Sequence, residues 1–480
     1  MSFYKNQFSL VVLLASSFAS PVFAQALAEE VVQEYVSEMA ASGVVVALGA
    51  KTVSGGTVEW KDVTMTTPQN EGEYKIAFIR AEEIGGDKVS MTYPKSVSFK
   101  IDPKGEQPAM DMIMTLGEMT HIISGTKDAR NHDFSAAALN MLATTAAPSL
   151  TMNFAFSDVV AQYQNTGGDV RNSKGIAKAA GLNLTYSLND KYMQMSMVSA
   201  YNNLASEFDI DLVSQENMEQ MFNGTRNMLM TYSMGSTSST IDMDSPDARV
   251  FVEGTTGSGA GSFSIQGGEL AMQGTGNDFD YSVKMKDLPL PPFQIGVDQS
   301  TMALKMPLAQ ADTPADARIQ LGFFGLKASD TIWGMVDPTG SLPREKATLN
   351  LDLTTKVKWL VDLMKIDEAR GMPAEISEVT INDITLKIAG ASFNGTGAAT
   401  LDNSKFPPEP VGEVNFDLKG GVGLLNKLVA LGLVPQQQGQ MVKMMSGMFT
   451  VPGGDGTDHL TSKIEMKKGG AILANGQRVK

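Results

Sequence analysis

Residues 149–157, SLTMNFAFS, decide the fold class, because large apolar side chains occupy every second position along them. In an extended chain, Leu150, Met152, Phe154 and Phe156 point to one face, and the smaller or polar residues between them point to the other. One apolar face and one polar face are typical of an antiparallel sheet with one side in water. This segment therefore predicts an antiparallel strand.

The same alternation recurs along most of the chain. The apolar positions include Tyr74, Ile76 and Phe78; Val97, Phe99 and Ile101; Met110, Met112 and Met114; Met193, Met195 and Met197; Ile319, Leu321 and Phe323; Leu349, Leu351 and Leu353; and Val414, Phe416 and Leu418. We therefore predict a mainly β (α+β) protein of elongated, twisted antiparallel sheets with a few capping helices.

Apolar spacings of three and four predict the helices. The clearest opens the chain at residues 27–42, where Gly43 ends it. The last two predicted helices, residues 422–431 and 436–448, form a hairpin near 422–448, because the sequence GLVP between them stops one helix and restarts another. Glycine, serine and threonine at 254–262 predict a mobile loop. The other helices are expected at residues 135–146, 215–230, 356–369, 422–431 and 436–448.

The first 24 residues read as an export signal. Lys5 precedes a short apolar run, and Val22 and Ala24 supply the small residues that a signal peptidase accepts. We predict cleavage between Ala24 and Gln25, no transmembrane anchor after cleavage, and the periplasm as the destination in a Gram-negative host. Consecutive prolines near residue 290 interrupt strand pairing. They divide the mature chain into an N-terminal β-rich region, 25–290, that begins with the opening helix, and a C-terminal β-rich region, 291–480, that holds the helical hairpin.

Composition excludes several classes of function. The 480 residues carry 38 Lys and Arg against 53 Asp and Glu, a formal net charge of −15. So acidic a chain is poorly suited to nucleic acid, which binds clustered positive charge. The absence of cysteine excludes disulfides, thiolate metal sites and thiol nucleophiles.

No catalytic motif is present. His121, His132 and His459 are the only histidines, and neither HxxxH nor HExxH occurs. The nucleophile motif G-x-S-x-G is also absent, and the S-x-x-K at 124–127 lacks its companions. We expect a histidine of the core or the sheet edge at 121, and a protein that is not an enzyme and has no catalytic, cofactor-binding or metal-binding residues. A hydrolase that uses one of the histidines is the remaining enzymatic alternative.

Two acidic stretches could hold a cation. Residues 274–279, GTGNDF, match one unit of a glycine- and aspartate-rich calcium repeat, but such a site needs several adjacent units. We expect an ordinary turn between strands there. The second stretch is expected to be a solvated acidic turn, with an oxygen-rich cation site as the alternative. It consists of Asp242, Asp244 and Asp247, with Asp209 and Asp211 nearby in the sequence.

Methionine is the most unusual feature, with 31 in the chain, many at alternating strand positions. Its unbranched, polarizable side chain suits apolar surfaces that must accept varied shapes. The functional interpretation is an apolar groove for acyl chains, and the alternative is that these residues fill the core of a large sheet. The candidate groove residues are Met110, Met112, Met114, Phe154, Phe156, Met193, Met195 and Met197.

Several segments carry a family resemblance. They are TVEWKDV at 57–63, VTINDITL at 379–386, GTGAATL at 395–401 and GGAILANG at 469–476. In this order of elements the chain resembles an exported alphaproteobacterial family catalogued as a domain of unknown function, and it is distantly similar in style to AsmA-like envelope proteins. The resemblance implies an envelope location and brings no active site. AsmA-like proteins are membrane-anchored, whereas this chain is expected to lose its only apolar segment.

We therefore expect an exported, non-enzymatic envelope protein that holds or shields a lipid or another hydrophobic envelope component on an apolar sheet face. The alternative is a structural or assembly factor that acts through contacts with an envelope protein. Nucleic acid is not an expected partner under either hypothesis.

Overall fold

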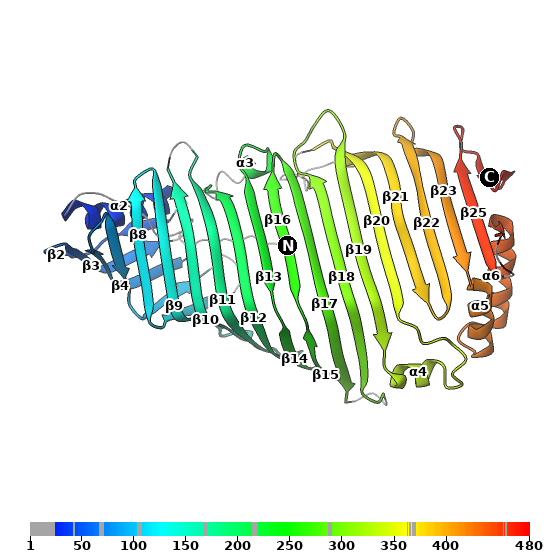
Figure 1. The fold of residues 1–480 in the computed structure, drawn as a ribbon, viewed down its shortest axis with the longest axis horizontal. Helices are drawn as coiled ribbons and strands as arrows, with labels where there is room; N and C mark the ends of the chain where they lie inside the picture. The colour runs from blue at the N-terminus through cyan, green and yellow to red at the C-terminus, as the bar shows by residue number, and fades with distance from the viewer. Residues whose placement is uncertain are drawn as a thin grey trace. The chain divides into compact units, whose positions relative to one another are not determined.

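The computed structural model describes residues 25–480 except 42–43, 67–71, 103–107, 168–169, 214–218, 287–289, 362, 364–365, 367–370, 455 and 457. Strands make up 64% and helices 12%, which confirms the predicted mainly β, antiparallel fold with a few helices (Figure 1). The predicted export signal, residues 1–24, lies outside the described residues. The chain divides into two compact units. Unit 1 comprises Met1–Met221, Thr225–Glu253 and Met285–Leu288, and unit 2 comprises Phe222–Gly224, Gly254–Lys284 and Pro289–Lys480.

Unit 1 is an antiparallel sheet that splits into two arms. One half of β4 pairs with β5 and the other half with β6, while β9 pairs with both β8 and β7. Beyond β9 the sheet continues through β10, β11 and β12. The strands are β1 (Val45–Ala47), β2 (Lys51–Ser54), β3 (Thr57–Thr66), β4 (Gly72–Glu83), β5 (Lys88–Thr92), β6 (Ser96–Ile101), β7 (Met110–Leu116), β8 (Met119–Thr126), β9 (Ala129–Thr145), β10 (Ser149–Thr166), β11 (Asn172–Asn189), β12 (Gln194–Asp211), β13 (Met228–Met234), β14 (Thr237–Asp244) and β15 (Arg249–Thr256), which runs across the division between the units.

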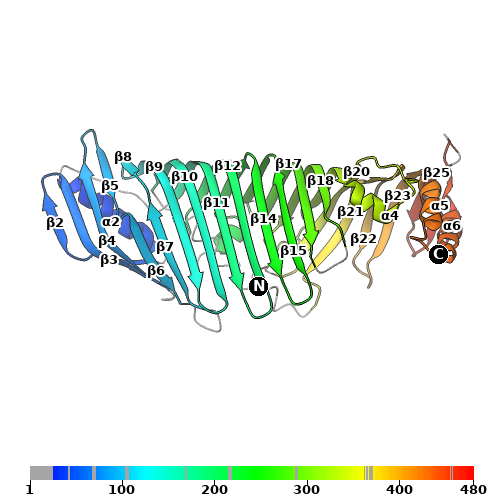
Figure 2. The same ribbon diagram turned by 90° about the horizontal axis from the view of Figure 1, so that it is seen from below.

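The core of unit 1 lies between the opening helix and the sheet. Helix α2 (Gln25–Ala41) confirms the helix predicted at 27–42, and it packs on β3, β4 and β5 (Figure 2). Val31 and Val32 of the helix meet Trp60 and Ile79 of the sheet in a cluster whose side chains are almost fully buried. Burying side chains of this size stabilises the unit by about 1.5–3 kcal/mol each.

Unit 2 is also built of antiparallel strands, in which neighbouring strands along the chain pair in order from β16 to β23, and β25 follows β23. Its strands are β16 (Gly259–Gln266), β17 (Glu269–Met285), β18 (Phe293–Pro307), β19 (Ala315–Ala328), β20 (Ala347–Trp359), β21 (Ala374–Ile388), β22 (Ala391–Asp402), β23 (Glu409–Lys419), β24 (Val451–Pro452), β25 (His459–Met466), β26 (Ile472–Ala474) and β27 (Gln477–Arg478).

The helices of unit 2 lie at the ends of strands. Helix α4 (Asp330–Val336) follows β19. Helices α5 (Gly421–Ala430) and α6 (Gln436–Phe449) come after β23 and before β25 in the sequence. The last two confirm the helices predicted at 422–431 and 436–448, and they pack against each other.

The helix predicted at 135–146 is wrong, and the helices predicted at 215–230 and 356–369 are wrong where the structure describes strand. Residues 135–146 belong to β9, which pairs with strands on both sides over its length, and residues 356–359 belong to β20. At 215–230 the described helix is α3 (Glu219–Phe222), and β13 begins at Met228. Intrinsic helix preferences, even those of alanine and leucine, amount to less than about 1 kcal/mol per residue, so pairing with neighbouring strands overrides them.

Two predicted loops are also wrong. The stretch 254–262 contains the end of β15 and the start of β16, where Gly259 pairs with Gly276. The turn expected at 274–279 lies inside β17, because this strand pairs with both β16 and β18 there. Asp278 adopts a left-handed conformation with φ of 55°, which Asp tolerates better than most residues. Residues 274–279 therefore form an irregular part of β17 and not a turn.

Candidate functional site

One face of the unit 2 sheet is apolar from strand to strand. Residues directly opposite each other in an antiparallel pair share a face. Three such ladders cross the sheet, and all their members except two serines are apolar or glycine. They are Ser300, Phe323, Leu349, Leu386, Phe393, Leu418 and Leu460; Gly274, Met302, Leu321, Leu351, Ile384, Gly395, Phe416 and Ser462; and Met272, Leu304, Ile319, Leu353, Ile381, Gly397, Val414, Ile464 and Ala474. We call this surface the open apolar face.

Two irregularities in β21 keep the face continuous. Asp352 pairs with Asp383, but the next residue of β20, Leu353, pairs with Ile381, so Asn382 is an extra residue. Without that bulge, the spacing of three between Ile381 and Ile384 would put them on opposite faces. A second shift, between Lys356 and Val357, similarly brings Ile376 opposite Val357.

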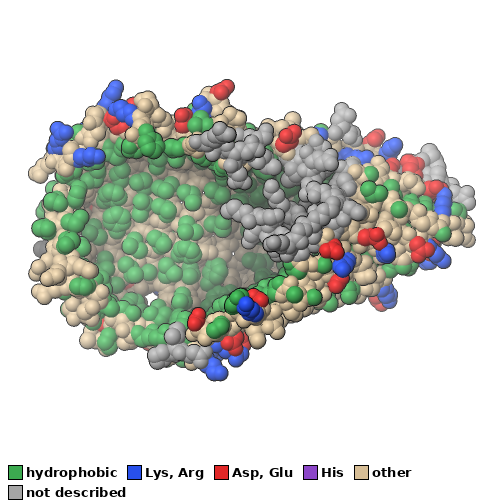
Figure 3. Space-filling model, turned by 180° about the vertical axis from the view of Figure 1, so that it is seen from behind, with side chains coloured by type: hydrophobic (Ala, Val, Ile, Leu, Met, Phe, Trp, Pro, Cys, Tyr) green, Lys and Arg blue, Asp and Glu red, His purple; other side chains and the backbone are tan. Residues whose placement is uncertain are grey.

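The open apolar face is exposed. Seven of its large side chains, or of those paired directly beside it, are 40–49% accessible: Met302, Ile319, Leu321, Leu349, Ile376, Leu386 and Ile388. In the space-filling view this side of unit 2 is hollowed and lined with hydrophobic side chains (Figure 3). Contiguous exposed apolar surface of this extent is rare on soluble proteins and marks a binding surface.

The reverse side of the same strands is polar. Arg318 donates to both carboxylate oxygens of Asp352, at 2.9 and 2.7 Å. Lys463 pairs with Glu413 at 2.8 Å, and Thr385 donates to Asn394 at 3.2 Å. Water therefore solvates one side of the sheet readily and the other poorly.

The groove residues predicted from the sequence lie in unit 1. Met110, Met112 and Met114 are on β7, Phe154 and Phe156 on β10, Met195 and Met197 on β12, and Met193 precedes β12. Cross-strand pairing brings the strand members to one face: one ladder joins Met112, Ala143, Met152, Tyr186 and Met197. Met112 and Ala143 are buried, and the predicted groove residues other than Met112 are intermediate in exposure. Their role as a groove stays a prediction.

A second feature of unit 1 is a buried pair of histidines. The Tyr93 hydroxyl lies 3.0 Å from His121 Nδ1, and His121 Nε2 lies 3.2 Å from His132 Nδ1. His132 stacks on Tyr163, with ring centroids 4.4 Å apart and planes 2° from parallel. Burial lowers the pKa of His121 to about 3, and burial together with the charges of His121 and Arg130 lowers that of His132 well below its usual value. Both rings are therefore neutral at physiological pH, as expected for a core histidine at position 121.

Carboxylates of α2 lie beside this layer. Burial raises the pKa of Glu34 to about 8, although the nearby Arg130 charge opposes the shift. Burial likewise raises the pKa of Glu38 to about 7 against the effect of Arg171. The guanidinium of Arg130 donates to the carbonyl oxygen of Gly125, but its Nε and Nη2 have no partner among the described residues. Buried polar atoms are normally satisfied, so we expect ordered water here.

The acidic stretch considered for a cation is occupied by basic and amide side chains. Arg249 donates to both oxygens of Asp242, at 3.0 and 2.6 Å, and lies 3.8 Å from Asp244. Asp209 pairs with Lys174 at 2.7 Å. In the part of the chain that the structure describes, no group of three or more His, Asp or Glu side chains is placed to hold a metal ion.

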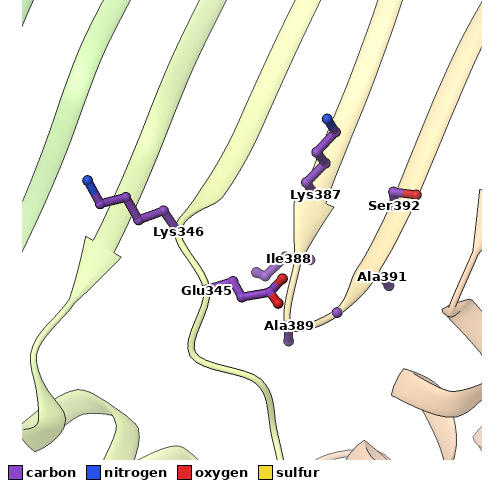
Figure 4. Close-up of a pocket in the computed structure, with 8 residues that line it drawn as sticks. Glu345, Lys346, Lys387, Ile388, Ala389, Ala391 and Ser392 are labelled. Carbon is purple, nitrogen blue, oxygen red and sulfur yellow. The ribbon is translucent and has the colours of Figure 1, made fainter.

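The third histidine and a small pocket lie in unit 2. His459 Nε2 is 2.6 Å from Asp417 Oδ2. The pocket lies at the end of β21 and β22, and its lining includes Glu345, Lys346 and Lys387. Figure 4 shows the two lysine side chains pointing away from each other, and Lys346 pairs with Asp298 at 2.6 Å. The charged groups do not converge, so no reaction is assigned to it.

Within the described ranges, no helix has the length and apolar character needed to cross a membrane. The fold and surface together define a class of β-sheet protein with one uncovered apolar face.

A family model described as "Uncharacterized protein conserved in bacteria (DUF2125)" matches residues 213–476, more than half of the chain. The chain belongs to this family, which confirms the predicted membership of a family of unknown function. All three ladders lie within the matched residues. Neither the curated proteins nor the solved structures provide a match. The AsmA-like character and the alphaproteobacterial source stay predictions.

The sequence contained a signal for the open apolar face. The alternation at Ile319, Leu321 and Phe323, and at Leu349 and Leu351, predicted its strands. It did not distinguish this face from a core, because alternation is the same whether or not another element covers the apolar side.

Proposed function

We propose that this chain is a non-enzymatic, exported envelope protein that binds lipid acyl chains on the open apolar face of unit 2. The observation that supports the proposal is the exposure of 40–49% at large side chains such as Met302 and Ile319, within ladders whose polar members are two serines. Covering exposed apolar surface with apolar groups removes it from water, and this transfer is favourable.

The dimensions of the face suit a lipid. The second ladder crosses eight strands, so at about 4.8 Å per strand it is roughly 34 Å long. An acyl chain spans about half of the ~30 Å hydrocarbon core of a bilayer, so one or more chains fit along the ladder. Each methylene removed from water contributes about 0.8 kcal/mol.

The chemistry of the face favours an acyl chain over a peptide. A peptide backbone carries amide groups that need hydrogen-bonding partners when they are buried. The ladders offer Ser300 and Ser462 as their only polar side chains, and the backbone groups of the strands are paired within the sheet. An acyl chain needs no such partners.

The proposed location follows from the predicted signal at residues 1–24. In the periplasm an apolar ligand needs shielding from water, and the polar reverse side of the sheet, in a chain whose net charge is −15, favours solubility. The proposal therefore covers export, envelope location and lipid binding together.

Organic extraction of the purified mature protein, followed by lipid mass spectrometry against a mock-purified control, tests the proposal. We expect stoichiometric lipid from the wild type and little from Leu321→Glu/Leu349→Glu. The matched control is Gln320→Glu/Thr348→Glu, which adds the same charge at adjacent positions on the reverse side and should retain lipid. A lipid-free wild type, or recovery of a stoichiometric envelope protein in place of lipid, would favour the assembly-factor alternative.

A further inference from the structure

Helix α6 exposes a stripe of methionines. Met441, Met444, Met445 and Met448 are 48–68% accessible, and their spacing of three and four places them on one side of the helix. We call these four residues the methionine stripe. Unlike the sheet methionines, they belong to no strand ladder.

The stripe faces away from the rest of unit 2. Helix α6 packs through Gly439, where an added Cβ would lie 2.6 Å from Val429 Cγ2 of α5. Ser446 and Phe449 are the other less exposed positions toward its end. At 100° per residue, Gly439 and Ser446 lie on the side of the helix opposite the methionine stripe.

The helical hairpin adjoins the open apolar face. Ser462, a ladder residue, donates to the carbonyl oxygen of Phe449 at 2.6 Å. At the start of α5, an added Cβ on Gly421 would lie 2.6 Å from Cδ2 of Leu418, another ladder residue. Figures 1 and 2 show α5 and α6 beside β23 and β25. A ligand that enters or leaves the face at this edge passes the hairpin.

The charge of the hairpin is opposite to that of the whole chain. Residues 419–450 contain Lys419, Lys427 and Lys443 and no Asp or Glu, whereas the chain has a net charge of −15. The nearby Asp458 accepts hydrogen bonds from the N–H groups of Val422 and Gly423 at the start of α5. The hairpin segment itself therefore carries a positive formal charge in an acidic chain, which favours contact with an anionic surface.

We infer that α6 docks on the surface of an anionic lipid bilayer, with the methionine stripe inserted among the acyl chains and the lysines of the hairpin near the headgroups. This rests on the proposed function and specifies where the open apolar face exchanges lipid. A helix with one apolar side and a polar opposite side lies in the plane of the membrane interface. Lys443, the one lysine of α6, lies on the side away from the methionine stripe and donates to Asn426 Oδ1 of α5. Methionine adapts to a fluid, irregular environment, and the stripe offers no aromatic anchor or polar partner for a specific protein contact.

Vesicle flotation of the full mature chain tests the docking. We expect the wild type to float with vesicles of phosphatidylglycerol and phosphatidylethanolamine, and less with vesicles of phosphatidylcholine alone. Replacing the four methionines of the stripe by glutamine should lower binding by more than about tenfold, whereas replacement by leucine should preserve it. The control Met335→Gln/Met372→Gln, at two exposed methionines outside α6, should float as the wild type does.

Equal flotation of the glutamine variant and the wild type overturns the inference, as does a wild type that floats with neither vesicle. Loss of a wild-type dimer or protein complex in the glutamine variant, without flotation, also overturns it and assigns the stripe to protein contacts. Uptake of a fluorescent fatty acid in the absence of vesicles separates the two proposals. The glutamine variant should take up the probe normally, whereas Leu321→Glu/Leu349→Glu should lose uptake and still float.

Discussion

Units 1 and 2 are both antiparallel sheets with one apolar face, but they treat that face differently. In unit 1, helix α2 covers β3, β4 and β5 and completes a buried core that includes Trp60 and Ile79. In unit 2, few large side chains are buried among the described residues, and those of the ladders are exposed or intermediate in exposure. The same strand pattern therefore forms a buried core where α2 covers it and an exposed apolar surface where no helix covers it.

The largest difference between the two units is expected when one isoleucine in each is replaced by alanine and the free energy of unfolding is measured. Ile79 is 1% exposed and Ile319 is 49% exposed. We expect Ile79→Ala to lower the free energy of unfolding by about 2–5 kcal/mol, because it leaves a cavity beneath α2. Ile319→Ala should cost under about 1 kcal/mol, because the side chain is already in water. Chemical denaturation of lipid-free protein measures both, and equal losses would mean that the face of unit 2 is covered in solution.

The helical hairpin offers a pair of glycines with opposite expected effects. Gly439→Ala should destabilise the packing of α5 on α6 by about 1–3 kcal/mol, because the new Cβ would press on Val429. Gly447 of the same helix has nothing within 4 Å of such a Cβ, so Gly447→Ala should stabilise the helix by up to about 1 kcal/mol. Hydrogen exchange of the hairpin amides measures both changes. The same sign at the two positions would contradict the observed packing.

The buried histidines should make unit 1 sensitive to acid. Their folded pKa values lie below the usual 6.5, so the unfolded chain binds more protons as the pH falls from 6.5 toward 3. Stability should be complete above pH 6.5 and decline below it. His132→Phe should flatten this decline in the unfolding midpoint against pH. An unchanged slope would show that the histidines are not buried as described.

Glu34 should produce a smaller effect in the opposite direction. Its folded pKa of about 8 exceeds the usual 4.5, so the folded protein holds a proton that the unfolded chain releases between these values. Its contribution to stability should fall as the pH rises from 4.5 to 8. Glu34→Gln should remove this fall, while Gln33→Ala, at an exposed position on the same helix turn, should leave it. Persistence of the fall in Glu34→Gln would contradict the assigned cause.

The sequence predicted the strands better than it predicted which of their apolar faces another element covers. Alternation correctly identified the strands around Phe154, Leu321 and Leu351, because period two is a local property of the chain. Residues 135–146 were wrongly expected to be helical, since their apolar spacing also suits a helix and only pairing with β8, β7 and β10 decides the conformation.

The groove predicted from the sequence and the open apolar face lie in different units of the chain. Methionine content directed attention to Met112 and its neighbours in unit 1, where Met112 is buried. The exposure of the ladder around Leu349 and of the methionine stripe of α6 is decided by tertiary packing, because it depends on whether another element covers them. Sequence periodicity carries no information about that.

The most direct test places a photoreactive amino acid at Leu349 and, in a matched protein, at Thr348. These neighbours on β20 lie on opposite faces, and Leu349 is 40% exposed. After irradiation in cells, mass spectrometry should find lipid adducts at position 349 and none at 348. Adducts to protein alone at position 349, or equal lipid adducts at both positions, would contradict lipid binding on the open apolar face.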